Sequence, residues 1–128
     1  MDQPLPILVV EDDHMIQDIV KDALIEGGFE VVIASSGEQA VSLLDASKPK
    51  YRALVTDIKL NGKIEGWEIA KHAREIDPAF PVVYMTGDSA DDWAANGVPN
   101  SILLTKPFAP AQLVTAVSQL LNAGTSTT

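Results

Sequence analysis

Cysteine is absent from this sequence of 128 residues. Its absence excludes disulfide frameworks, thiolate zinc sites and cysteine nucleophiles. Long hydrophobic runs are absent as well, so no segment of the sequence is expected to span a membrane. Residues 1–6 contain no basic region followed by an apolar stretch, so no signal peptide is predicted and the cytoplasm is the expected location.

Positive charge is scarce. Nine lysines and arginines stand against eighteen aspartates and glutamates, which gives a formal net charge of −9. A negative field opposes binding to phosphate backbones and to anionic membranes. We therefore expect no direct contact with nucleic acid or with a membrane, and we expect cations or basic protein surfaces as partners.

Short apolar runs alternate with amphipathic segments along the whole chain. Five runs predict strands, at residues 7–10, 30–34, 53–56, 81–85 and 101–104. The segments between them predict helices, and this alternation is typical of an α/β fold with a doubly wound parallel sheet. Between the last two runs only residues 89–95 have helical character, so the fourth helix is predicted to be short or irregular. We expect an N-terminal extension over 1–4, one domain over 5–122 and a disordered tail over 123–128.

Three features of the helices can be predicted. Asp13 is expected to cap the first helix and Ser36 the second, because short oxygen-bearing side chains accept hydrogen bonds from the first turn. The third helix is expected to bury one face, made of Ile69, Ala70, Ala73 and Ile76. Trp67 lies off that face, so we expect it to pack against the preceding loop.

Polar residues follow four of the five predicted strands. Glu11, Asp12 and Asp13 come after the first strand, Asp57 after the third, Thr86 after the fourth and Lys106 after the fifth. In an open parallel sheet, ligands bind outside the carboxyl ends of the strands. Clustered carboxylates without histidine or cysteine favour Mg²⁺, and an aspartate beside that metal can act as a nucleophile toward phosphorus. Taken singly, each residue also has an ordinary explanation, as a helix cap, a turn residue or a solvated lysine.

Four segments in this order resemble the receiver domain of two-component response regulators. They are ILVVEDD, ALVTDIKL, VVYMTGD and ILLTKPF, and the resemblance covers residues 5–122. It implies a flavodoxin-like (CheY-like) fold with strand order 2-1-3-4-5. It also implies that Asp57 is the phosphoacceptor, that Thr86 is the switch hydroxyl and that Lys106 is the conserved-type lysine of the site.

The resemblance further implies a metal site. Asp12 would bind Mg²⁺, or Mn²⁺ in its place, directly, and Glu11 would bind it through water. Asp57 and the main-chain carbonyl of Lys59 would complete the protein ligands. A cis peptide bond before Pro107 is also implied.

The implied function is that of a stand-alone receiver. It would take a phosphoryl group from a histidine kinase or a histidine phosphotransfer protein and would act on an unknown downstream protein, as a monomer or as a phosphorylation-dependent dimer. It would catalyse its own phosphorylation and dephosphorylation without turning over an external substrate.

The sequence departs from the family pattern at Leu103, where most receivers carry tyrosine or phenylalanine. The usual coupling between the switch hydroxyl and an aromatic ring on the fifth strand is therefore in doubt. Lys59 and Asp88 flank the site, and we expect an ion pair between them to shield Asp57 from water. On the first helix, Met15 and Ile19 either extend toward solvent, forming a docking patch with Phe108 and Pro110, or pack against neighbouring helices.

Three other functions fit the sequence less well. A pseudo-receiver would use the same fold for protein contacts only. The intact Asp12, Asp57, Thr86 and Lys106 count against it, whereas Leu103 keeps it open as the alternative. A flavin mononucleotide carrier needs a phosphate loop after the first strand, where this chain has three acids. A phosphohydrolase with an aspartate nucleophile would carry that nucleophile after the first strand in a D-x-D spacing, together with a cap domain, and the sequence shows neither.

Overall fold

The computed structural model describes residues 5–46, 50–88 and 90–125. Its strands are β1 (Ile7–Val10), β2 (Val31–Ala34), β3 (Ala53–Asp57), β4 (Val82–Thr86) and β5 (Ile102–Thr105). They form one parallel sheet in the order β2-β1-β3-β4-β5. The flavodoxin-like strand order is therefore confirmed, and each strand begins or ends within one residue of its predicted position.

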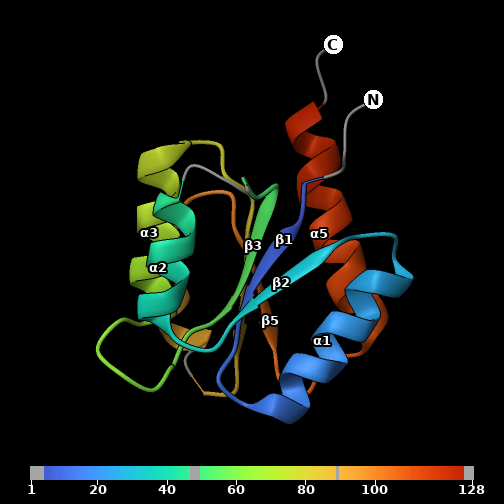
Figure 1. Cartoon of the computed structure of the whole chain (residues 1–128), viewed down its shortest axis with the longest axis horizontal. Helices are drawn as coiled ribbons and strands as arrows, with labels where there is room; N and C mark the ends of the chain where they lie inside the picture. Colours follow the sequence, from blue (N-terminus) through green and yellow to red (C-terminus); the bar gives the residue numbers. More distant parts are fainter. Residues whose placement is uncertain (1–4, 47–49, 89, 126–128) are drawn as a thin grey trace.

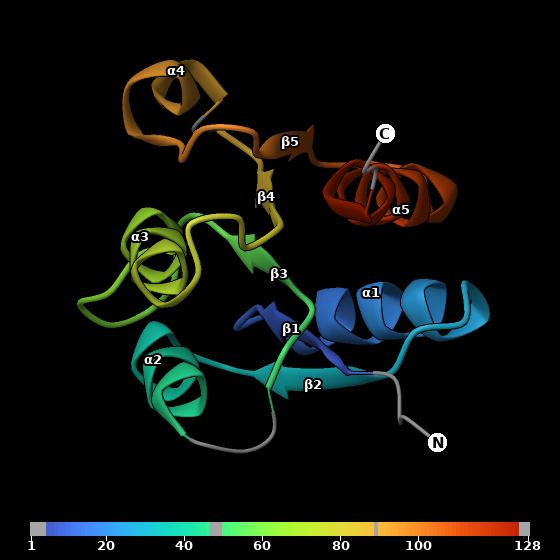
Figure 2. The ribbon, with the colours of Figure 1, turned by 90° about the horizontal axis from the view of Figure 1, so that it is seen from above.

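Helices cover both faces of this sheet (Figures 1 and 2). They are α1 (His14–Glu26), α2 (Gly37–Asp45), α3 (Gly66–Ile76), α4 (Trp93–Asn96) and α5 (Pro110–Thr125). Helices α1 and α5 lie on one face, whereas α2 and α3 lie on the other. The fourth helix is a single turn preceded by a 3₁₀ turn over Ala90–Asp92, so the prediction of a short fourth helix is confirmed.

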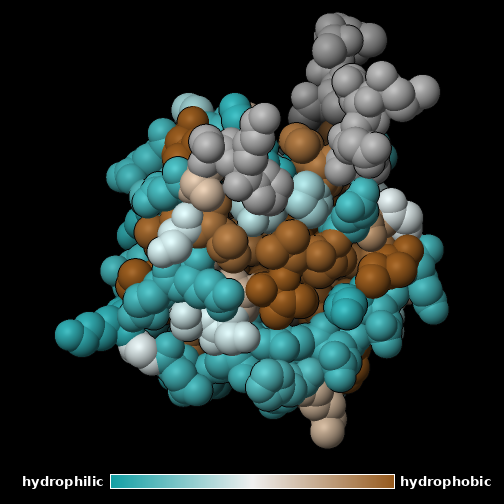
Figure 3. Space-filling model, in the orientation of Figure 1, coloured by the Kyte–Doolittle hydropathy of each residue, from teal (hydrophilic) through white to brown (hydrophobic). Residues whose placement is uncertain are grey.

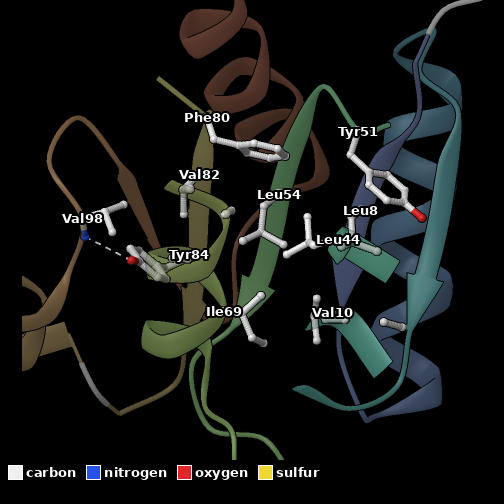
Figure 4. Packing of buried hydrophobic residues seen from close by; sticks show 14 of the residues in the cluster. Leu8, Val10, Leu44, Tyr51, Leu54, Ile69, Phe80, Val82, Tyr84 and Val98 are labelled. Carbon is white, nitrogen blue, oxygen red and sulfur yellow. Dashed lines mark hydrogen bonds between the residues drawn. The ribbon is translucent and has the colours of Figure 1, made fainter. Parts of the chain in front are cut away.

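Alternation along β1 divides the core into two clusters. Leu8 and Val10 point to the cluster under α2 and α3 (Figure 4), whereas Ile7 and Val9 point to the cluster under α1 and α5. All four are fully buried. A strand buried on both faces explains why this run is apolar throughout and does not alternate with polar residues.

The edge strand β2 is less protected. Its first three residues, 31–33, are only half-buried. In the space-filling view, hydrophobic atoms gather over this strand and hydrophilic atoms surround them (Figure 3).

Both predicted helix caps are confirmed. Asp13 accepts hydrogen bonds from the backbone N–H groups of Met15 and Ile16, at 2.9 and 3.4 Å. Ser36 accepts one from the N–H of Gln39 at 3.1 Å. These contacts satisfy donors that have no partner inside the first turn.

Predictions failed where elements end. Ile76 is 51% exposed because it is the last residue of α3, beyond the buried turns of that helix. The ring of Trp67 packs on the ring of Tyr84, with centroids 4.8 Å apart, which is a contact that the sequence did not predict. Helix α5 continues to Thr125, three residues past the predicted end of the domain at 122. Predictions for residues 1–4 and 126–128, and for Ser89, concern positions outside the described residues.

Both described ends of the chain lie beyond the amino ends of the strands. Strand β1 starts there, and α5 returns to that end of the sheet after β5 (Figure 1). The carboxyl ends of the strands lie at the opposite end of the sheet. Within the described residues, no helix has the length and apolar character needed to cross a membrane.

Candidate functional site

The parallel register brings the predicted site residues to one edge of the sheet. Asp57 ends β3 and pairs with Met85 of β4, so it lies beside Thr86, the last residue of that strand. Thr86 in turn pairs with Thr105 of β5, and Lys106 follows directly. The convergence expected from strand ends is therefore present.

Three carboxylates meet at this edge. Glu11, Asp12 and Asp57 each offer one oxygen, and these oxygens all lie within 4.8 Å of one another. Glu11 is 1% exposed and Asp57 is 8% exposed. Burial, and then the charge of Asp57, raise the pKa of Glu11 to about 7. The cluster therefore favours a cation, and its oxygen-only donors suit Mg²⁺.

Lys106 supplies a counter-charge from β5. Its Nζ donates to Oε1 of Glu11 at 3.2 Å and to Oδ2 of Asp57 at 3.1 Å. Burial lowers the pKa of Lys106, but the two carboxylates outweigh burial and the net direction is upward. The side chain is therefore a stable ammonium group in direct contact with the Asp57 carboxylate.

Backbone groups of neighbouring residues contact the second carboxylate oxygen and the main-chain carbonyl of Asp57. The N–H of Ile58 donates to Oδ1 at 2.9 Å, so both carboxylate oxygens have partners. Gly66, at the start of α3, leaves no room for a side chain, because a Cβ there would collide with the carbonyl oxygen of Asp57. Helix α3 thus begins in direct contact with the residue that the sequence predicts to react.

Thr86 and the Lys59–Asp88 pair border the site on the β4 side. Thr86 is buried, and its Oγ1 accepts a hydrogen bond from the N–H of Asp88 at 3.2 Å. The predicted ion pair is confirmed, with Lys59 Nζ 3.2 Å from Oδ2 of Asp88. The effect of this pair on hydrolysis, and the role of the Lys59 carbonyl as a metal ligand, stay predictions.

Two tethers of the β3–α3 loop were not predicted. The N–H of Asn61 donates to Oδ2 of Asp12 at 2.9 Å, and the N–H of Lys63 donates to Oε2 of Glu38 at 3.2 Å. Both donors are backbone groups. Side-chain identity therefore gives no signal for them in the sequence.

Leu103 on β5 packs beside a buried aromatic residue of β4. Leu103 pairs with Tyr84 of β4 and packs against the core cluster. Tyr84 is fully buried, and its hydroxyl accepts a hydrogen bond from the N–H of Val98 at 3.1 Å (Figure 4). The aromatic hydroxyl in this region is therefore on the fourth strand.

The peptide bond between Lys106 and Pro107 is cis, as the resemblance implied. A groove beside it is lined by Ile16, Ile19, Lys106, Pro107 and Phe108. Met15 is 73% exposed and Ile19 is 46% exposed, so these two side chains extend toward solvent. Pro110 is not part of the groove lining and begins α5.

Comparisons with known proteins agree with this geometry. Residues 7–118 match the family model described as "Response regulator receiver domain". The transcriptional regulatory protein TrcR of Mycobacterium tuberculosis is 33% identical over 122 residues, which are 93% of this chain and 46% of that protein. The regulatory protein PhoP of Bacillus subtilis is 30% identical over 118 residues, covering 91% of this chain and 48% of that protein. The chain thus spans about half the length of these curated relatives.

A response regulator receiver protein from Sinorhizobium medicae has a solved structure similar to this one. It is 45% identical, the TM-score is 0.91, and the match covers 94% of this chain and 97% of that chain. Sequence, fold and the edge of the sheet that carries the acidic residues thus lead to one conclusion: this chain belongs to the family of response regulator receiver domains of two-component signalling systems.

Proposed function

We propose that this receiver accepts a phosphoryl group on Asp57 from a phosphohistidine, with Mg²⁺ held by Asp12 and Asp57 directly and by Glu11 through water. The observation that carries the proposal is the contact between Lys106 and Asp57 inside a cluster of three carboxylates. A structural ion pair alone would not need two further buried or half-buried acids beside it, because like charges at this spacing repel.

The chemistry proposed is an in-line substitution at phosphorus. A carboxylate oxygen of Asp57 forms a bond to phosphorus while the bond from phosphorus to the donor imidazole nitrogen breaks. The imidazole leaves with the bonding electron pair. Bound Mg²⁺, or Mn²⁺, would offset the negative charge of the phosphoryl oxygens and of the acidic cluster.

The remaining roles fall to Lys106 and Thr86. The Lys106 ammonium stabilises the phosphoryl oxygens, exchanging its contact with Asp57 for one with the incoming group. The Thr86 hydroxyl donates a hydrogen bond to the same group. The main-chain carbonyl of Lys59 would complete the protein ligands of the metal.

Partners follow from this chemistry. The donor is a histidine kinase or a histidine phosphotransfer protein in the cytoplasm, and it docks over the exposed Met15 and Ile19 and the adjoining groove beside Pro107. The phosphorylated form acts through contacts with a downstream protein.

Intact mass after incubation with Mg²⁺ and a small-molecule phosphodonor tests the proposal. Wild type and the control variant Asp22→Asn, which changes an exposed acid on α1, are expected to gain one phosphoryl group. Asp57→Asn is expected to gain none, and omission of Mg²⁺ should abolish the gain in wild type and in Asp22→Asn. A folded wild-type chain that gains no phosphoryl group even from a phosphorylated histidine donor would instead support a receiver used only for protein contacts.

A further inference from the structure

The β3–α3 loop, residues 58–65, is held to two other parts of the chain by carboxylates. Its Asn61 N–H donates to Asp12 at 2.9 Å, and Asp12 is one of the three acids of the site. Its Lys63 N–H donates to Glu38 at 3.2 Å, and Glu38 lies in the first turn of α2. Glu38 is exposed and is not part of the acidic cluster.

The contact between α2 and this loop is close-packed. A Cβ on Gly62 would lie 3.0 Å from Oε1 of Glu38, and Gly62 has a φ of +105°. A Cβ on Gly37 would lie 2.5 Å from the carbonyl oxygen of Ile64. Two glycines therefore let the loop approach the first turn of α2, and Glu38 bonds to it where the two segments meet.

Loss of the Glu38 tether would act on the metal site through the loop. Asn61 and Lys63 are two residues apart, so movement of the segment at Lys63 also moves the N–H that holds Asp12. The same loop carries Lys59, whose carbonyl is a proposed ligand. Oxygen ligands that must be ordered on binding reduce affinity for a cation, because their ordering costs entropy.

We propose that Glu38 is a positioning residue for the Mg²⁺ site, acting through its hydrogen bond to the Lys63 N–H, which holds the β3–α3 loop and with it Asp12. The inference rests on the proposed function only in assuming that the acidic cluster binds Mg²⁺. It does not depend on phosphorylation of Asp57.

A rival explanation is that the negative charge of Glu38 attracts Mg²⁺ at a distance. Glu38→Gln separates the two, because glutamine keeps an acceptor oxygen but carries no charge. Glu38→Ala removes both. Glu26→Ala, on the exposed last turn of α1, removes one charge without touching the loop and is the matched control.

The measurement is a Mg²⁺ titration of the whole chain followed by the backbone amide signals in ¹⁵N NMR spectra. These spectra give the Mg²⁺ dissociation constant and also report the Asn61 and Lys63 N–H groups directly. Glu38→Ala is expected to bind Mg²⁺ about threefold more weakly, the effect of losing roughly one exposed hydrogen bond. Glu38→Gln and Glu26→Ala are expected to match wild type, and Glu38→Ala should shift the Asn61 signal in the absence of metal.

A second variant tests the same contact from the loop side. Gly62→Ala places a methyl group against Glu38 at a positive φ, so it should also weaken Mg²⁺ binding. Combined with Glu38→Ala, its effect should be less than additive, because both changes release the same contact.

Two results would overturn the inference while leaving phosphorylation of Asp57 in place. One is wild-type Mg²⁺ affinity in Glu38→Ala with an unmoved Asn61 signal, and the other is equal weakening in Glu38→Gln and Glu38→Ala. A wild-type chain that does not bind Mg²⁺ at all would refute the proposed metal site as well as this inference.

Discussion

Replacement of Lys106 by methionine tests the electrostatics of the site most directly. Lys106 makes contacts of 3.2 and 3.1 Å with Glu11 and Asp57. At an effective dielectric constant of 20, each contact corresponds to about 5 kcal/mol of Coulomb attraction. Desolvation of the ions opposes most of that attraction, and breaking a buried pair costs a net of about 3–5 kcal/mol. Because Lys106 keeps 22% of its side chain exposed, we expect a loss near the lower limit, about 3 kcal/mol.

The loss of stability in Lys106→Met should depend on divalent cations. Without metal, Lys106→Met leaves Glu11 and Asp57 facing each other with no counter-charge. With saturating Mg²⁺, the ion supplies that charge, and we expect most of the difference from wild type to disappear.

Urea unfolding followed by circular dichroism measures the loss of unfolding free energy in Lys106→Met. The measurement is made with a chelator and then with Mg²⁺, so that it also gives the dependence of this loss on the cation. The experiment is best done near pH 8, because the pKa of Glu11 is raised to about 7 and the carboxyl is then ionised in wild type. Lys71→Met, at an exposed position on α3, is the control and should change stability little. An equal loss for Lys106→Met with and without Mg²⁺ would refute the view that lysine and metal neutralise the same acids.

Three further predictions concern single contacts. Lys59→Ala removes the exposed ion pair with Asp88 and should speed loss of the phosphoryl group about threefold, since such pairs contribute under about 1 kcal/mol. The time course of intact mass measures this rate, and an unchanged lifetime of the phosphorylated form would contradict the shielding role. Gly66→Ala forces a methyl group against Asp57 and should lower the unfolding free energy by about 3 kcal/mol. Near wild-type stability in urea would be inconsistent with that close contact. Tyr84→Phe should cost about 1–2 kcal/mol, because it leaves a buried N–H without its acceptor. Burial also raises the pKa of Tyr84 above its ordinary value of 10.0. Because the tyrosine of the unfolded chain ionises first, the unfolding free energy falls above pH 10. The Tyr84→Phe variant should lose that part of the pH dependence.

The fold was predictable because its signals are local. Apolar runs such as residues 7–10 are buried on both faces of the sheet, and α1 and α2 start directly after the capping residues Asp13 and Ser36. The convergence of Asp57, Thr86 and Lys106 was predictable for the same reason, because a parallel sheet places every strand's carboxyl end at one edge. The Lys59–Asp88 pair followed from their positions relative to two of those ends.

What could not be predicted depends on backbone atoms or on how elements end. The tethers from Asn61 to Asp12 and from Lys63 to Glu38 use N–H groups that almost every residue carries. The exposure of Ile76 depends on where α3 ends relative to the sheet, which the spacing of apolar residues does not determine. Helix α5 continues past 122 although Asn122 and Gly124 are residues typical of helix ends, so their presence did not determine the last turn.

The opposite placement of the chain ends and the acidic cluster has a practical consequence for experiments on partners. A biotin or a fluorescent label attached next to the start of β1 or to the last turn of α5 would lie at the opposite end of the strands from the carboxyl end of β3, where Asp57 stands (Figure 1). A receiver immobilised in this way presents its acidic cluster to the solution. Association of a donor protein could then be followed on a sensor surface without the attachment itself blocking the approach to the aspartate.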